Sequence, residues 1–337
     1  MKNLIPITLA ATFVASGISS AQTPAYSKPS GYVTQNLNQG FNLVALTLQR
    51  SPVASGTFTS TNGVVLTDSS ANFTGFIAGR IYTLEILSGS LANQVAEVSG
   101  SSIAGQTITT TQNLSALGIG NARYAVRLAP TLEEIFGVAT VTSGGILKAA
   151  LNSTSADNIW IPNGSGGYDR YFLRSGAYQK ITGPTTREAA PNVPIVYLDG
   201  ILIEKRDAGV VPLTVTGSVK TTATTTSVIQ GFNLVSVVAP VGLTLRTSGL
   251  DDGDLKPALN PSSADNLWVQ QTDGSYKRYY RRGSVSSPAA AVWRDVATNT
   301  EIPLAVDPSL TGAVLIERRD STPASVSFTV PNSFNNL

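Results

Sequence analysis

Hydrophobic side chains alternate along short runs of this chain in the way that β-strands require. In residues 40–48, GFNLVALTL, Val44 and Leu46 lie on one face of an extended strand and Leu43 lies on the other. Residues 231–239, GFNLVSVVA, repeat the pattern. Because both faces of each run are apolar, the pattern predicts strands that are covered on two sides.

Three blocks of sequence occur twice in the same order. The run above is the first, and residues 147–174 match residues 255–282 without a gap, at a constant spacing of 108 positions. The third block, ILIEKRD at 201–207, returns as VLIERRD at 314–320. Repeats in one order predict two homologous modules that arose by duplication.

The stretch between the first two blocks of the first copy has no counterpart in the second copy. It carries its own alternating runs, separated by Gly, Ser and Asn, which predicts a small β domain inserted in a surface loop. Leu147, Ala150 and Leu151 follow a helical spacing. A short helix is therefore expected within residues 142–152 and again within 253–260.

The predicted fold is mainly β, with two homologous β-sandwich or barrel-like modules, a small β domain inserted in the first and short helices only. The predicted organisation is a signal peptide at 1–21, a first module split into 31–49 and 131–208, the inserted domain at 50–130, a linker or edge strand at 209–230 and a second module at 231–330.

The first residues predict export. Lys2 precedes an apolar run that ends near Ile18, and the small residues that follow, up to Ala21, are typical of a signal-peptidase site. The run is shorter than the roughly 20 apolar residues that span a membrane. We therefore expect a cleaved signal, no membrane span in the mature chain, and a final location outside the cell or on its surface, with the periplasm second.

Composition narrows the chemistry. The chain has no histidine and no cysteine, which excludes Ser-His-Asp triads, cysteine nucleophiles, disulfides and histidine-based metal sites. A formal net charge of +2 predicts neither nucleic acid nor anionic membrane as a partner. A pair of carboxylates or a Ser-Lys dyad remains available for catalysis, but Glu133 and Glu134 are adjacent and would point apart in a helical turn. We expect no enzyme, no cofactor and no metal.

The most similar repeated stretches are SADNIWIPNGSGGYDRYFLR at 155–174 and SADNLWVQQTDGSYKRYYRR at 263–282. Their shared aromatic residues are either core residues or exposed rings that stack on a sugar. Asp157 and Asp265 are expected to cap a turn or the end of a preceding helix. The candidate ligand-binding residues are Trp160, Tyr171, Trp268, Tyr279, Arg278 and Trp293.

Basic and aromatic residues interleave in the second copy, where the strand is either an ordinary hairpin strand or a binding face of that module only. In the first copy, Asp169 stands where the second has Lys277, and Leu173 stands where the second has Arg281. The basic surplus is therefore not part of the repeated design.

The order GFNLV, ADNLW, GSYKRYY and VLIERR resembles a β-rich module of secreted and surface-associated bacterial proteins. SSANF and YTLEILSGSLANQVAEVSG are likewise similar to stretches of uncharacterised exported bacterial proteins that carry the duplicated blocks. The resemblance implies a β fold and export, and that family has no established activity. Its terminal strand often contains a Pro-Gly step, of which this chain keeps only the glycine.

Together these features predict an exported, non-catalytic structural or adhesive protein of the cell surface or extracellular matrix. Its expected partners are surface polysaccharide, other matrix proteins or further copies paired through sheet edges. One alternative is a carbohydrate-binding protein that uses the repeated aromatic residues, which exposed coplanar rings would favour. The other is a carboxylate-dependent enzyme acting on polysaccharide, which a cleft with two facing carboxylates would favour.

Overall fold

The computed structural model describes residues 29–114, 118–140, 142, 144–250, 254–331 and 334. The predicted signal peptide lies outside these residues. The described chain is mainly β, and every pair of strands in it is antiparallel apart from isolated bridges. Its helices are short: α1 (Leu132–Phe136) and the 3-10 turns η1 (Gly100–Ser102) and η4 (Pro288–Ala290). The predicted fold class is confirmed.

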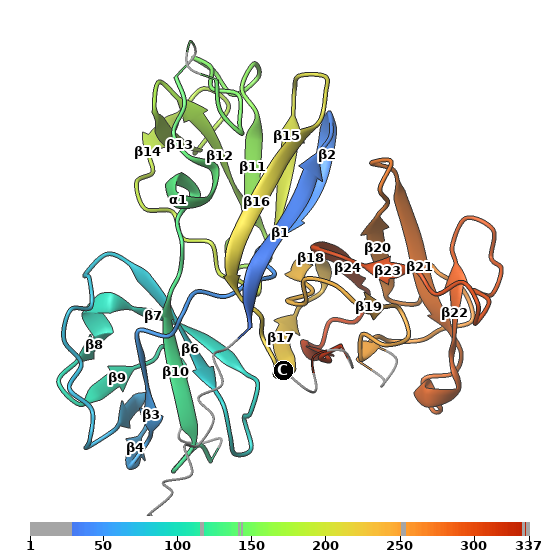
Figure 1. Ribbon diagram of the computed structural model, residues 1–337. Coiled ribbons are helices and arrows are strands. Elements are labelled where there is room, and N and C mark those ends of the chain that lie inside the picture. The colour runs from blue at the N-terminus through green and yellow to red at the C-terminus, as the bar shows by residue number, and fades with distance from the viewer. Residues whose placement is uncertain are drawn as a thin grey trace, which may run out of the picture.

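The first repeated blocks form a six-stranded sheet covered by a two-stranded ribbon (Figure 1). The sheet runs in the order β14-β13-β12-β11-β15-β2, and the ribbon pairs β1 with β16. Buried side chains from sheet and ribbon share one apolar core. The strands are β1 (Ser30–Leu37), β2 (Gly40–Ala45), β11 (Asn158–Pro162), β12 (Tyr168–Arg174), β13 (Ala177–Ile181), β14 (Arg187–Ala189), β15 (Gly200–Lys205) and β16 (Val211–Ser218).

The second set of blocks forms an equivalent sheet in the order β22-β21-β20-β24-β18, with a ribbon of β17 and β25 and a short pair of β19 and β23. A second, separate core lies between its sheet and ribbon. Residues 209–230 contain β16 and β17, so this segment gives one ribbon strand to each module. The strands are β17 (Thr224–Val228), β18 (Gly231–Ser236), β19 (Leu243–Thr244), β20 (Asn266–Gln270), β21 (Tyr276–Arg282), β22 (Val292–Asp295), β23 (Ser309–Leu310), β24 (Ala313–Arg318) and β25 (Ala324–Phe328).

The stretch without a counterpart forms two four-stranded sheets, β3-β10-β6-β7 and β4-β5-β9-β8, around a third core. Figure 1 shows these strands together below the first module. Their bounds are β3 (Ala54–Thr57), β4 (Ser60–Asn62), β5 (Val65–Thr67), β6 (Ile81–Ile86), β7 (Val95–Ser99), β8 (Ile103–Ala104), β9 (Thr107–Thr109) and β10 (Arg123–Leu128).

A buried ionic cluster ties this inserted unit to the segment between the modules. Glu85 on β6 forms ion pairs with Arg127 on β10 and with Lys220, which lies between β16 and β17. Burial acts to raise the pKa of Glu85, but the charges of Lys220 and Arg127 outweigh it and hold that pKa below its usual value. Because these side chains are shielded from water, each charge is stabilised by the opposite charges of the cluster.

The helix prediction was wrong at both repeated sites. The described residues of these segments, 142, 144–152 and 254–260, contain no helix. The backbone N–H of Lys148 donates to the Asp157 carboxylate and that of Ala150 donates to the carbonyl of Leu173, so these groups bond across the module and not along a helical turn. The helical spacing of apolar residues reflects burial of a loop.

The described α-helix occurs at 132–136 instead. Thr131 and Glu134 form a capping box, since each side chain accepts a hydrogen bond from the other's backbone N–H. Glu134 also forms ion pairs with Arg50 and Arg80. The two adjacent glutamates are thus not paired for catalysis, because Glu134 stabilises the helix start.

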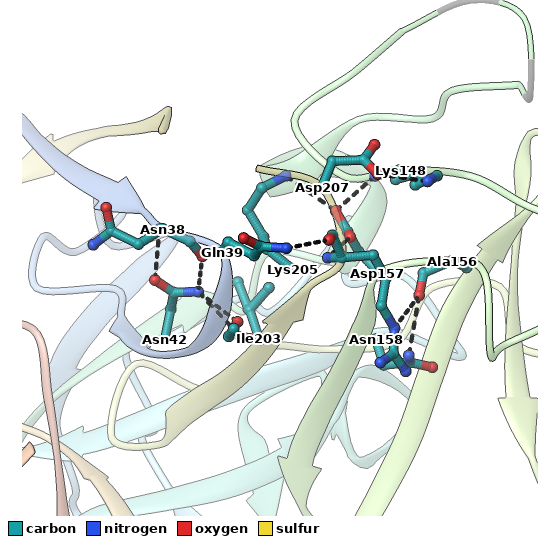
Figure 2. A network of polar contacts seen from close by, with 12 residues as sticks. Asn38, Gln39, Asn42, Lys148, Ala156, Asp157, Asn158, Ile203, Lys205 and Asp207 are labelled. Carbon is teal, nitrogen blue, oxygen red and sulfur yellow. Dashed lines mark hydrogen bonds and ion pairs between the residues drawn. The ribbon is translucent and has the colours of Figure 1, made fainter. Parts of the chain in front are cut away.

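One buried aspartate holds two segments of the first module together (Figure 2). Oδ2 of Asp157 accepts from the backbone N–H of Lys148 at 2.8 Å and forms an ion pair with Nζ of Lys205 at 3.2 Å. Oδ1 accepts from the backbone N–H of Arg206 at 2.7 Å. The aspartate therefore joins the loop before β11 to the end of β15.

The second module repeats this arrangement with different chemistry in one place. Asp265 accepts from the backbone N–H groups of Lys256 at 2.9 Å and Arg319 at 2.7 Å, and its cation is Arg318 at 3.1 Å. Both aspartates are buried. The shared ADN motif is explained by this structural role.

The shared GFN motif makes the corner between ribbon and sheet. Gly40 has a φ of +94°, a backbone conformation that side chains other than glycine rarely adopt. Asn42 then donates through Nδ2 to the carbonyls of Asn38 and Gly40, at 2.8 and 3.0 Å, and accepts from the N–H of Asn38. Asn233 makes the equivalent bonds in the second module.

We expect Asp157→Asn to lower the free energy of unfolding by about 3 kcal/mol, because the change leaves Lys205 buried without its counter-charge and turns an amide donor toward backbone N–H groups. Urea denaturation measures this. Asp207→Asn is the control: it removes an exposed ion pair with Lys148 and should cost less than about 1 kcal/mol. Equal losses in the two variants would contradict the account.

Candidate functional site

The two modules pack together through the outer faces of their sheets. Leu43 and Ala45 on β2 form one small apolar cluster with Leu234 on β18 and Ala313 on β24. A Cβ atom at Gly200 would lie 2.7 Å from Cγ of Leu234 and 2.8 Å from Cβ of Ala313, so only glycine allows this approach. The contact explains why both GFNLV strands are apolar on two faces: one face covers a module core and the other covers the partner module.

Two equivalent tyrosines cross this contact in opposite directions. The hydroxyl of Tyr168 donates to the carbonyl of Phe232 at 2.8 Å, and that of Tyr276 donates to the carbonyl of Phe41 at 2.7 Å. Donors and acceptors occupy matched positions of the two copies. The contact therefore has the reciprocal symmetry of a twofold-symmetric dimer interface, although both modules belong to one chain.

Glutamine side chains close the free edge of β2 beside this contact. Oε1 of Gln270 accepts from the N–H of Leu43 at 2.7 Å, and its Nε2 donates to the carbonyl of Phe41 at 3.1 Å. Gln35 bonds in the same manner to both backbone groups of Ala45. The equivalent of Gln270 in the first copy is Pro162, so the symmetry fails here.

Trp160 and Trp268 are half-buried, and an arginine from the neighbouring strand covers each ring. The guanidinium carbon of Arg170 lies 5.0 Å from the ring centre of Trp160, and that of Arg278 lies 5.1 Å from the ring centre of Trp268. Phe41 packs against Trp160 with ring centres 5.7 Å apart. The partners of these rings are side chains of the protein itself.

The other candidate aromatics lie in the module cores. Tyr171 belongs to the first core, and Tyr279 and Trp293 belong to the second; their exposed fractions are 8%, 2% and 2%. The structure therefore does not gather the six predicted residues into one site. Three are core residues, and Trp160, Trp268 and Arg278 belong to stacked pairs on two different modules.

A cavity of about 690 Å³ lies where the inserted unit meets both modules. Its walls include β7, the turn between β11 and β12, the segment before β15, and β17 with the start of β18. The backbone N–H of Thr225 on β17 donates to the carbonyl of Asn93 just before β7, at 3.1 Å, which holds one wall against the other. The volume falls within the range of small-molecule sites, roughly 300 to 1,000 Å³.

Two carboxylates from different units face this cavity. Burial raises the pKa of Asp199 to about 8, and the charge of Glu97 adds to that rise. Burial also raises the pKa of Glu97. By solvent-accessible surface Asp199 is half-buried and Glu97 is exposed, so water reaches both carboxyl groups. Neither makes a hydrogen bond or an ion pair within the described residues, and no lysine or arginine is among the lining residues.

This pair suits the binding of a cation better than catalysis. Enzymes that use two carboxylates keep one ionised and one protonated, by environments that push their pKa values apart. Here the surroundings of Asp199 and Glu97 raise both values. A ligand cation would favour the ionised form of both carboxyls and so oppose both shifts. In the part of the chain that is described, no group of three or more acidic side chains is placed to hold a metal ion.

Sequence patterns gave no signal for this site. Glu97 lies in the stretch that has no second copy, and the position equivalent to Asp199 in the second module is Gly312. A search for site residues among the repeated positions therefore misses both carboxylates. Only the docking of the inserted unit on the two modules brings the carboxylates to one cavity.

Comparison with known proteins gave no match: no family model fits the chain, and no curated protein or solved structure is significantly similar to it. Within the described ranges, no helix is both long enough and apolar enough to cross a membrane.

We expect the stability of the folded protein to fall as the pH rises from about 4 to about 8 because of Asp199. Its folded pKa is above the unfolded value near 3.8, so the folded state holds a proton that the unfolded state releases. That contribution is complete below about pH 4 and is lost as the pH passes through about 8.

Asp199→Asn should reduce this decline by an amount on the order of 2 kcal/mol, less than a fully enclosed carboxyl would give, since water reaches the cavity. Urea denaturation across the pH range measures it. Glu133→Gln on the exposed face of α1 is the control and should leave the wild-type profile. A wild-type profile without a decline would contradict the assignment.

Proposed function

We propose that this chain is an exported, non-catalytic structural or adhesive component of the cell surface or extracellular matrix. The observation that carries the proposal is the use made of the duplicated residues. The shared glycines and asparagines form the corners between ribbon and sheet. The shared aspartates join a loop to a strand in each module, and the shared tyrosines form hydrogen bonds across the contact between modules. What was duplicated is a scaffold, which supports a structural or adhesive role.

In the first module, the two edges of the sheet speak against self-association by strand pairing, which was one predicted mode. Side chains of Gln270 and Gln35 occupy the free edge of β2, and β14, at the other end of the same sheet, is three residues long, exposed and charged at Arg187 and Glu188. Short, charged or covered edges are the usual protection against strand addition. Adhesive contacts of this module are therefore expected through side chains of loops.

Leu151 and Leu259 are the repeated residues that the scaffold leaves without a role. They occupy matched positions and are 62% and 72% exposed. Each follows an alanine whose N–H bonds to β12 or β21, and each precedes an asparagine that accepts from a serine N–H three residues on. Each module thus presents an exposed leucine at the same position, on a loop that hydrogen bonds hold in place. This repetition supports one adhesive contact per module.

A polysaccharide-acting enzyme is the second candidate, because Glu97 and Asp199 share a cavity. The raised pKa values of both carboxylates favour binding over catalysis. Release of new reducing ends from a panel of polysaccharides tests it. Turnover that Asp199→Asn abolishes would replace the structural proposal with this one.

We expect the purified mature chain to bind washed envelope and matrix material of its own cells, and the double variant Leu151→Ser with Leu259→Ser to bind at least about tenfold more weakly, since each leucine would bury apolar surface in the contact. Pull-down with titrated protein measures this. Leu304→Ser, at an unrepeated leucine that is 83% exposed, is the control and should bind as wild type. Equal loss in control and double variant, or no binding by wild type, would contradict the proposal.

A further inference from the structure

The cavity at the junction of the inserted unit and the two modules (the junction cavity) is lined by polar side chains that form no hydrogen bonds within the described fold. The side chains of Gln94 and Gln112 from the inserted unit, and of Thr226, Ser227 and Ser325 from the second module, make no hydrogen bond to any described residue. Together with the two carboxylates they give seven uncommitted polar groups around one space. Polar groups at such a site bond to water or to a ligand.

The charge of the walls selects the kind of ligand. Glu97 comes from β7 and Asp199 from the segment before β15, so the two carboxylates belong to different units. Among the described residues, no lysine or arginine lines the cavity to neutralise them. A positively charged ligand would therefore gain two charge-assisted contacts and end the repulsion between them.

The uncharged residues that line the cavity suit a ligand with several hydroxyl groups. Amide and hydroxyl groups can donate to and accept from hydroxyls of a ligand. Phe232, which also lines the cavity, is 48% exposed and offers a flat apolar surface. An apolar surface beside many hydrogen-bonding groups matches a sugar ring, which has one apolar face and a polar rim.

We propose that the junction cavity binds an amino sugar, whose ammonium group forms ion pairs with Glu97 and Asp199 while its hydroxyls bond to the free glutamine, serine and threonine side chains. A neutral sugar would leave both carboxylates unpaired, and a metal ion would lack a third acidic ligand among the described residues. The site goes beyond the structural role proposed above and does not depend on it, because the repeated blocks supply neither carboxylate.

The test uses two ligands that differ in charge and share a backbone: the β-1,4-linked glucosamine disaccharide and its di-N-acetyl form. We expect titration calorimetry with the full mature chain at about pH 7 to detect the amine and to show at least about tenfold weaker binding of the acetylated form. Glu97→Gln and Asp199→Asn should each weaken amine binding by about tenfold or more, and Glu133→Gln should not.

Proton release gives a readout that a purely structural role would not produce. Because its raised pKa keeps a proton on Asp199 near neutral pH, binding of the ammonium should expel protons; the net release, lowered by any proton that the sugar amine takes up, is measured by titration in buffers of different ionisation enthalpy. Tyr168, the other titratable group of the lining, has a pKa raised by burial to about 12 and does not titrate there. Asp199→Asn should abolish the release.

Equal binding of amine and acetylated ligands, binding unchanged in both carboxylate variants, or no binding by folded wild-type protein would each overturn the proposal. The envelope-binding assay stays informative in every case, because its variants lie at Leu151 and Leu259, which do not line the cavity.

Discussion

The constraint that shapes this protein is that each module sheet is apolar on both faces at β2 and β18. The ribbon covers one face, and the other can be buried only against the matching sheet of the second module. Tyr168 and Tyr276 add one hydrogen bond in each direction, and Gly200 permits the close approach. Pairing of the modules therefore buries an apolar sheet face that a single module would expose to water.

Module pairing also creates the site. It places the β11–β12 turn, the segment before β15 and the start of β18 together, and the inserted unit closes the space through β7, which lies against β17 of the second module. The buried cluster of Glu85, Arg127 and Lys220 fixes that unit to the segment between the modules. The carboxylates of the cavity are thus held by contacts of three units, which is why none of the units alone carries the proposed chemistry.

Alternation and repetition sufficed to predict the β fold, because they record burial directly. The helix expected around Leu147 failed since hydrogen bonds to Asp157 and Leu173 compete with a helical turn, a competition that apolar spacing does not reveal. Among the candidate site residues, spacing could not say that Tyr171 and Tyr279 are core residues or that Arg170 and Arg278 cover the tryptophans. The cavity was beyond prediction because its residues are neither repeated nor close in sequence.

Small-angle X-ray scattering of Gly200→Val tests the pairing of the modules most directly. The new side chain would collide with Leu234 and Ala313, so the account predicts a larger radius of gyration with far-UV circular dichroism unchanged. Gly31→Val, where an added Cβ meets nothing within 4 Å, is the matched control and should scatter as wild type. A Gly200→Val protein with the wild-type radius of gyration would contradict the claim that this contact holds the modules together.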